Sequence, residues 1–141
     1  LWLLKDSTVD DRLAPLIDAA WERRSTLDPA RAEPELRDAI ESILAALESG
    51  AARVASPGEG GWQVHEWIKK AVLLYFRLTP TQRIEAAPAP YFDKVPLRHS
   101  GLSEAELREL GARIVPGAIV RRGAYIGRNA VLMPSFVNIG A

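Results

Sequence analysis

A six-residue period near the end of the chain constrains the fold more than any other feature of this sequence. Each of four consecutive hexads begins with an aliphatic residue, and most have a small residue at the fifth position. The aliphatic first positions are Ile114, Val120, Ile126 and Leu132. This repeat is typical of a left-handed parallel β-helix, in which each hexad supplies one short strand and one corner.

The spacing predicts which side chains face the axis of the β-helix. We expect Ile114, Val120 and Ile126 to point inward from the three faces of one coil, and Leu132 to start the next coil above Ile114. Phe136 breaks the small-residue rule of the fifth position. Because coils are stabilised by stacking on their neighbours, and the sequence stops partway into the second coil, we expect a truncated chain. Its start at a leucine rather than a methionine indicates the same at the other end.

Helical periodicity governs the chain before the repeats. The clearest pattern has Pro34 in the first turn, apolar residues three and four positions apart, and Gly50 as the C-terminal stop. Ser103 and Glu106 form a capping box for a short helix that Gly111 ends. The other expected elements are a helix that starts near 13 and ends before 28, a hairpin across 53–64, and a helix over about 66–77.

Three spaced prolines make residues 84–99 an expected irregular linker, with an extended segment at 91–95. The predicted fold class is therefore α+β. A mainly helical N-terminal domain with a small hairpin, residues 1–110, is followed by the first coil or coils of a left-handed β-helix, residues 111–141.

Composition argues against several classes of function. Eighteen acidic and eighteen basic residues cancel, so nothing indicates a nucleic-acid or anionic membrane partner. The lack of cysteine excludes disulfides and thiolate metal sites and fits a cytoplasmic location. The longest apolar run, 71–76, is too short to span a bilayer. His65 and His99 lie outside the repeats and cannot supply the three-histidine zinc site that γ-class carbonic anhydrases build on this β-helix, so we expect no metal.

Four strings of the sequence resemble the sequences of a known protein family. In this order and spacing they are similar to the bacterial tetrahydrodipicolinate N-succinyltransferase family, from about Leu13 to Ala141. Residues 1–12 fall outside the resemblance, and the hairpin tip at 57–61 departs from it as local variation. The strings are ERR at 22–24, WQVHEWIKKAVLLYFRL at 62–78, YFDKVP at 91–96 and VLMPSFVNIGA at 131–141.

The resemblance implies an acyltransferase of lysine biosynthesis through diaminopimelate. Such an enzyme moves a succinyl group from succinyl-CoA to the amino group of the ring-opened tetrahydropyridine dicarboxylate, tetrahydrodipicolinate. It further implies a homotrimer without a tightly bound cofactor, and catalytic carboxylates in later coils. We therefore assign no residue here to catalysis and expect the chain as given to be inactive. The alternatives are a non-catalytic cap and trimerisation module, or another hexapeptide-repeat acyltransferase with a different acceptor.

Arginines are the only candidate binding residues. By the resemblance, Arg113 matches a position that contacts the dicarboxylate substrate, and a planar guanidinium can grip a carboxylate with two parallel hydrogen bonds. The alternative is a surface arginine that pairs with Glu106 or Glu109. Three further arginines near the corners are either contacts for the phosphates of coenzyme A or, as we favour, solvated side chains; the coenzyme A contacts stay unassigned. They are Arg121, Arg122 and Arg128.

Overall fold

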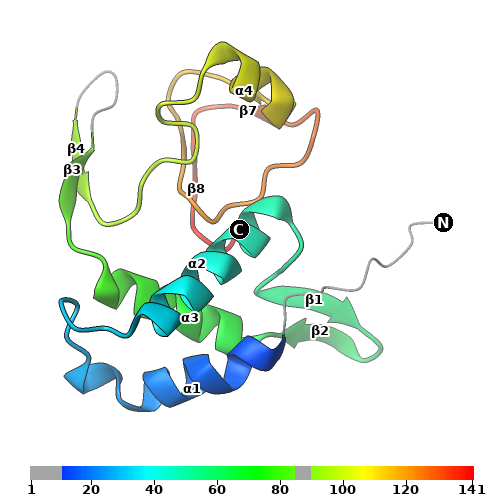
Figure 1. Ribbon diagram of the computed structural model, residues 1–141. Coiled ribbons are helices and arrows are strands. Elements are labelled where there is room, and N and C mark those ends of the chain that lie inside the picture. Colours follow the sequence, from blue (N-terminus) through cyan, green and yellow to red (C-terminus); the bar gives the residue numbers. More distant parts are fainter. Residues whose placement is uncertain (1–10, 85–89) are drawn as a thin grey trace.

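The computed structural model describes residues 11–84 and 90–141. Three helices form its lower part in Figure 1: α1 (Ala14–Glu22), α2 (Pro34–Ser49) and α3 (Glu66–Leu78), with short 3-10 turns at Asp11–Leu13 and Arg24–Thr26. Within the described ranges, no helix has the length and apolar character needed to cross a membrane.

The main hydrophobic core lies where the three helices pack together. Helix α2 contributes its buried stripe, because its apolar residues recur three and four positions apart. Among the larger side chains of the three helices, those with no exposed surface are Ile17 of α1, Leu36, Ile43 and Leu44 of α2, and Leu74 of α3. The amphipathic pattern read from the sequence therefore places the helices correctly.

Helix ends agree with the capping signals in the sequence. Pro34 lies in the first turn of α2, and Gly50 ends it with a φ of 76°. In α4 (Glu104–Leu110), Ser103 and Glu106 form the complete capping box, and Gly111 ends the helix with a φ of 68°. These predictions are confirmed, since both glycines adopt the left-handed conformation that side chains disfavour.

Two antiparallel hairpins flank α3. The expected hairpin is formed by β1 (Ala55–Gly58) and β2 (Gly61–Val64). A second hairpin pairs β3 (Gln82–Ile84) with β4 (Tyr91–Asp93), where an irregular linker was expected. The extended segment expected at 91–95 is confirmed for β4. Its pairing with β3 was not expected, because the prolines between the two strands indicate a linker. Residues 85–89 lie outside the described ranges.

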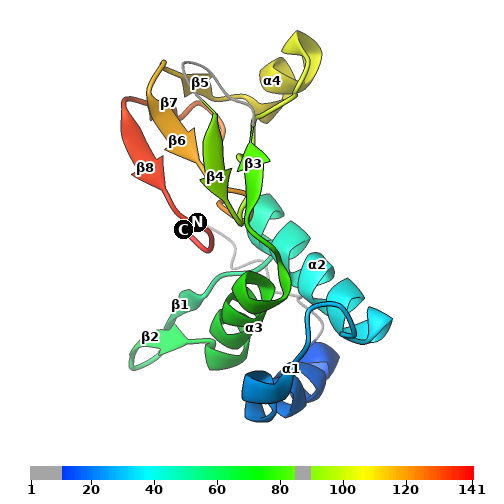
Figure 2. The same ribbon diagram turned by 90° about the vertical axis from the view of Figure 1, so that its left-hand side faces the viewer.

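The hexads form two parallel strand pairs, which Figure 2 shows beside the β3–β4 hairpin. Strand β5 (Arg113–Ile114) pairs with β7 (Val131–Leu132), so that Ile114 lies beside Leu132, three hexads later, as expected. Strand β6 (Ala118–Val120) pairs with β8 (Ser135–Val137). The fold is therefore α+β, with parallel pairing between segments about one coil apart.

A small second hydrophobic cluster fills the interior of the hexad region. Val120 and Ile126 are buried in it with Ala124, and Leu132 packs against them. These three aliphatic first positions face the interior as expected. Ile114 is only half-buried and lies outside this cluster, in the wall of a cavity described below. The difference arises because β5 is the first strand of the repeats, and the segment packed before it leaves space beside Ile114.

The hexad region packs directly on α2. Ile139 is buried in the main core, although it follows β8. A Cβ on Gly123 would lie 2.8 Å from Ile139 Cγ1 and 3.4 Å from Leu44 Cδ2, so the backbone approaches closely here. The Gly123 N–H donates to Glu48 Oε1 at 2.9 Å. These contacts fix where the repeats sit on the helices.

Candidate functional site

Arg113 presents its side chain on the outside of β5. Its backbone N–H donates to the Ala130 carbonyl at 2.9 Å, and the residue is exposed. The alternative pairing is absent: in the described part of the chain, the Arg113 guanidinium forms no ion pair. Glu106 instead accepts hydrogen bonds from the Ser103 N–H at 2.8 Å and from its hydroxyl at 2.6 Å. The Arg113 guanidinium is therefore accessible to a ligand.

The Arg121 side chain is not solvated, contrary to the reading that we favoured from the sequence. Its Nη2 donates to Asp93 Oδ2 at 2.7 Å and its Nη1 to Asn138 Oδ1 at 3.0 Å, and only 18% of its side chain is exposed. The guanidinium also lies near the rings of Phe76 and Phe136, at 5.5 and 5.4 Å from their centres. The solvated reading is wrong here because β4, which carries Asp93, packs beside the hexads, and the sequence does not show this packing.

Arg122 is likewise paired, with Glu41 of α2. Burial lowers the pKa of Arg122, but the hydrogen bond and the charge of Glu41 outweigh this effect and raise its pKa overall. Both Arg121 and Arg122 thus hold the hexad region against the rest of the chain. Neither guanidinium is free for the phosphates of coenzyme A.

Arg128 remains exposed, and its side chain runs over Gly111. Its Nε and Cζ lie 3.4 and 3.5 Å from the position that a Cβ on Gly111 would take. Among the residues that the structure describes, Arg128 has no ion pair. It is the one of the three corner arginines that fits the solvated reading.

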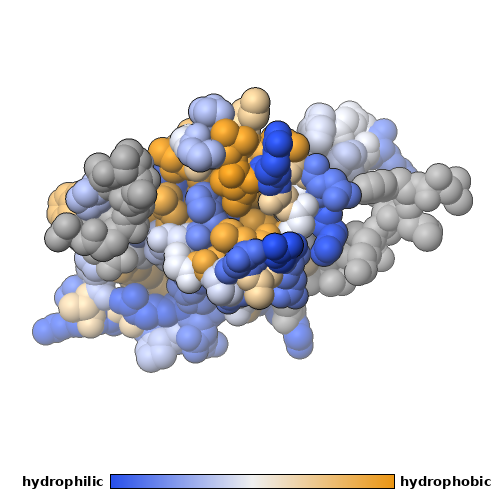
Figure 3. Space-filling model, turned by 90° about the horizontal axis from the view of Figure 1, so that it is seen from above, coloured by the Kyte–Doolittle hydropathy of each residue, from blue (hydrophilic) through white to orange (hydrophobic). Residues whose placement is uncertain are grey.

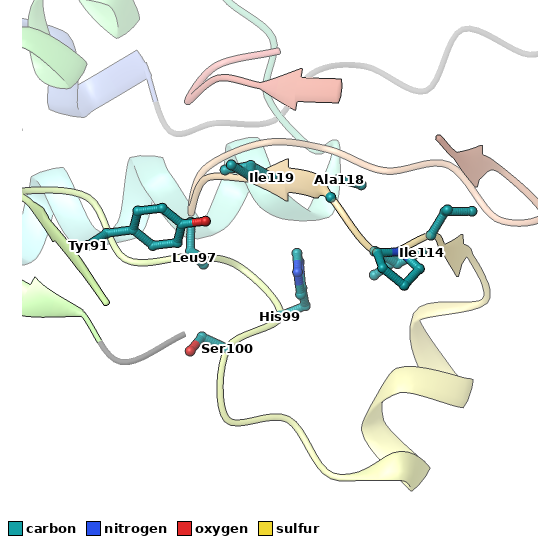
Figure 4. A pocket seen from close by; sticks show the side chains of 10 residues that line it. Tyr91, Leu97, His99, Ser100, Ile114, Ala118 and Ile119 are labelled. Atoms are coloured by element: carbon teal, nitrogen blue, oxygen red, sulfur yellow. The ribbon is translucent and has the colours of Figure 1, made fainter. Parts of the chain in front are cut away.

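A cavity of about 350 Å³ lies between the segment before α4 and strands β5 and β6. Figure 4 shows the imidazole of His99 standing between Tyr91 on one side and Ile114 on the other. His99 Nδ1 is buried and has no partner among the described residues. Burial lowers the pKa of His99, so the ring is neutral at pH 7. The sequence placed His99 in a loop without a role and gave no signal of the cavity.

An aromatic groove of about 250 Å³ adjoins this cavity and shares Tyr91, Leu97 and Ile119 with it. Phe92 and Phe136 border it and are 77% and 59% exposed. Figure 3 looks down on the molecule from the α4 end and shows hydrophobic side chains at the surface there, bordered by hydrophilic ones. The sequence signal for this groove is the string YFDKVP at 91–96, because β4 lies within that string and its residues line the groove.

The histidines do not come together. The Ser56 hydroxyl and His65 Nε2 lie 2.8 Å apart at the β1–β2 hairpin, whereas His99 lines the cavity. Across residues 11–84 and 90–141, no group of three or more metal-ligating side chains is present.

Comparisons with a family model and with curated proteins all find similarity to the same family. Residues 12–78 match the family model described as tetrahydrodipicolinate N-succinyltransferase N-terminal. The 2,3,4,5-tetrahydropyridine-2,6-dicarboxylate N-succinyltransferases of Paracidovorax citrulli and Escherichia coli O1:K1 are each 50% identical over 130 residues, 92% of this chain and 47% of the relative. The enzyme of that name from Xylella fastidiosa is 50% identical over 134 residues, 94% of this chain and 48% of the relative.

The chain therefore spans about half the length of the curated relatives that it matches. The matched residues include both the helices and most of the hexads, since they cover more than nine tenths of the chain. The resemblance read from the four strings is thereby confirmed, and the chain is similar to the N-terminal half of the tetrahydrodipicolinate N-succinyltransferases.

Proposed function

We propose that this chain is the N-terminal half of a tetrahydrodipicolinate N-succinyltransferase, which transfers a succinyl group from succinyl-CoA to the amino group of tetrahydrodipicolinate in lysine biosynthesis. The observation that carries the proposal is the 50% identity, over more than nine tenths of the chain, to relatives of that name. An unrelated protein that merely used hexapeptide repeats would not match through the helices as well.

The proposed domain division places a helical domain at 1–110 and the first coils of a left-handed parallel β-helix at 111–141. The pairing of Ile114 with Leu132 supports it, because a β-helix coil of three hexads brings these residues together. The left-handed sense rests on the hexad pattern of the sequence. The homotrimer and the cytoplasmic location rest on the resemblance, and the location also on the lack of cysteine.

In the proposed reaction, a neutral amine attacks the thioester carbonyl of succinyl-CoA. The step needs a base for the amine proton and hydrogen-bond donors for the developing oxyanion. We assign neither role to this chain. Its proposed contribution is Arg113, whose exposed guanidinium, without an ion pair in the described residues, holds a carboxylate of the acceptor. The chain alone is then expected to show no turnover.

A chimera tests this proposal. Residues 12–141 replace the matching segment of the Xylella fastidiosa relative, and thiol release from succinyl-CoA is measured with and without tetrahydrodipicolinate. We expect acceptor-dependent release from the chimera and from the unaltered relative, and none from the chain alone.

The outcomes separate the alternatives. A folded chimera that transfers succinyl only to a different amine would indicate another hexapeptide-repeat acyltransferase. A folded, trimeric chimera without any transfer would indicate a non-catalytic cap and trimerisation module. Light scattering and circular dichroism of the chimera establish its assembly and folding in each case.

A further inference from the structure

The cavity beside His99 has the size of a small-molecule site. Its volume of about 350 Å³ lies within the range that ligand pockets have in proteins. A water-sized group takes up about 30 Å³, so the cavity has room for roughly ten non-hydrogen atoms. A single substituted aromatic ring has this size.

Backbone hydrogen bonds fix the side of the cavity that carries His99. The Arg98 N–H donates to the Val120 carbonyl at 2.8 Å. The Arg122 N–H donates to the Pro96 carbonyl at 2.9 Å. The segment before α4 is therefore held against β6, and the His99 side chain has a defined position.

The opposite side of the cavity is the turn between β5 and β6. The Val115 N–H donates to the Leu132 carbonyl at 2.9 Å, and the Ala118 N–H donates to the Val115 carbonyl at 3.0 Å. Gly117 permits this turn with a φ of 93°. Because backbone hydrogen bonds tie both sides to the hexads, a ligand would need to order little of the chain on binding.

The lining of the cavity favours a neutral ligand. Leu97, Ile114 and Ile119 supply apolar surface, and Tyr91 adds an aromatic ring that extends toward the imidazole of His99 in Figure 4. None of the described residues that line the cavity is charged at pH 7, since burial lowers the pKa of His99. A charged ligand would lose hydration there without gaining an opposite charge.

His99 supplies a polar contact for such a ligand. Its Nδ1 is buried, and neither ring nitrogen has a hydrogen-bond partner among the described residues. Because Nδ1 is buried, Nε2 is the nitrogen that a ligand can reach. In the neutral ring, Nε2 donates or accepts according to the tautomer, and a hydroxyl group is a suitable partner in both cases. A phenol hydroxyl also stays neutral at pH 7.

We propose that this cavity binds a small neutral phenol, with the aromatic ring among Tyr91, Ile114 and Ile119 and the hydroxyl hydrogen-bonded to His99 Nε2. The apolar walls take up the ring, and the imidazole selects a ring that carries a hydroxyl. The inference goes beyond the proposed function and does not depend on it, because the cavity is formed entirely by this chain.

The test titrates three probes of similar shape into the whole chain at pH 7.5 by calorimetry: 4-methylphenol, p-xylene and 4-methylbenzoate. We expect saturable binding of 4-methylphenol and weaker binding of the charged 4-methylbenzoate. His99→Leu should weaken 4-methylphenol binding about three- to tenfold, the effect of one lost hydrogen bond, and should change p-xylene binding much less. His99→Gln should stay close to wild type, because its amide reaches about as far as Nε2.

Two further variants locate the site. Ile114→Phe adds volume to the wall of the cavity and should weaken the binding of both 4-methylphenol and p-xylene. The matched control is His65→Leu, because His65 lies at the β1–β2 hairpin and does not line the cavity. It should leave the affinity for 4-methylphenol unchanged.

A cavity that holds only water would show no saturable binding of 4-methylphenol, and this result would overturn the proposal. Equal losses of 4-methylphenol and p-xylene affinity in His99→Leu would overturn the hydrogen bond to the imidazole. Binding that Ile114→Phe leaves unchanged would place the site elsewhere and overturn the proposal even if His99→Leu does not fold. Thermal melting of each variant shows whether it is folded. The titrations use the chain without succinyl-CoA, so their outcome is separate from that of the chimera.

Discussion

Arg121 donates a hydrogen bond of 2.7 Å to the carboxylate of Asp93, and this contact joins the second hexad to strand β4. The same guanidinium donates to Asn138 and lies near the rings of Phe76 in α3 and Phe136 in β8. One side chain thus contacts three parts of the fold that are distant in the sequence. It also forms part of the wall of the aromatic groove.

We expect Arg121→Ala to lower the free energy of unfolding by about 2 kcal/mol, because a charge-assisted hydrogen bond is lost and Asp93 keeps a half-buried carboxylate without its partner. Urea denaturation measures this change. The matched control is Arg31→Ala, which removes an exposed arginine 3.8 Å from Asp28 and should cost less than about 0.5 kcal/mol. Equal effects of the two substitutions would show that the Arg121 contacts contribute no stability.

Gly123→Ala should disturb the packing of the hexads on α2. Gly123 has a φ of 81°, and an added Cβ would lie 2.8 Å from Ile139 Cγ1. The left-handed conformation and the forced contact together should cost about 2 kcal/mol or more. Gly60→Ala is the control, since a Cβ there meets nothing within 4 Å. Thermal unfolding compares the two variants, and a Gly123→Ala melting temperature equal to that of Gly60→Ala would contradict the packing described.

Local signals explain what the sequence predicted well. The ends of α2 and α4 depend on residues within one turn, such as Pro34, Ser103 and Gly111, so the sequence alone locates them. The parallel pairing of Ile114 with Leu132 follows from a fixed period, which also needs no knowledge of the rest of the fold.

Contacts between distant segments explain what the sequence missed. Arg122 pairs with Glu41, 81 residues earlier, and no local pattern announces such a partner. The extended segment at 91–95 follows from the sequence, but its pairing with β3 does not, because the prolines between the two strands indicate a linker. The cavity at His99 lies where the segment before α4 meets strands β5 and β6, so its existence depends on how these segments pack. Arg113 was found through the family resemblance, and its binding role stays a prediction.

His99 should make the stability of the chain depend on pH. Burial lowers the pKa of His99 below the ordinary value of 6.5, so the unfolded chain takes up a proton at a higher pH than the folded chain does. The free energy of unfolding should therefore fall as the pH drops below about 6.5. We expect wild type to lose more stability than His99→Gln between pH 7.5 and 5.5.

Urea denaturation of both proteins at the two pH values checks this expectation. This pH window lies above the pH range in which Glu33 and Glu106 titrate. A hydrogen bond from Arg23 lowers the pKa of Glu33 below its ordinary value of 4.5, and hydrogen bonds from Ser103 do the same for Glu106. Their contribution is complete above about 4.5 and is lost only as the pH falls further. Identical pH dependence of wild type and His99→Gln would show that the buried imidazole does not affect stability.

Arg113→Ala, placed in the chimera of the proposed function, should weaken binding of the acceptor. Loss of a charge-assisted hydrogen bond of about 1.5 to 3 kcal/mol raises the dissociation constant roughly ten- to a hundredfold. Arg113→Lys should restore only part of the affinity, because lysine keeps the charge but lacks the paired planar donors. The affinity for succinyl-CoA should hardly change. Acceptor and succinyl-CoA titrations measure both constants, and an acceptor constant within about twofold of wild type would make Arg113 a surface residue without a binding role.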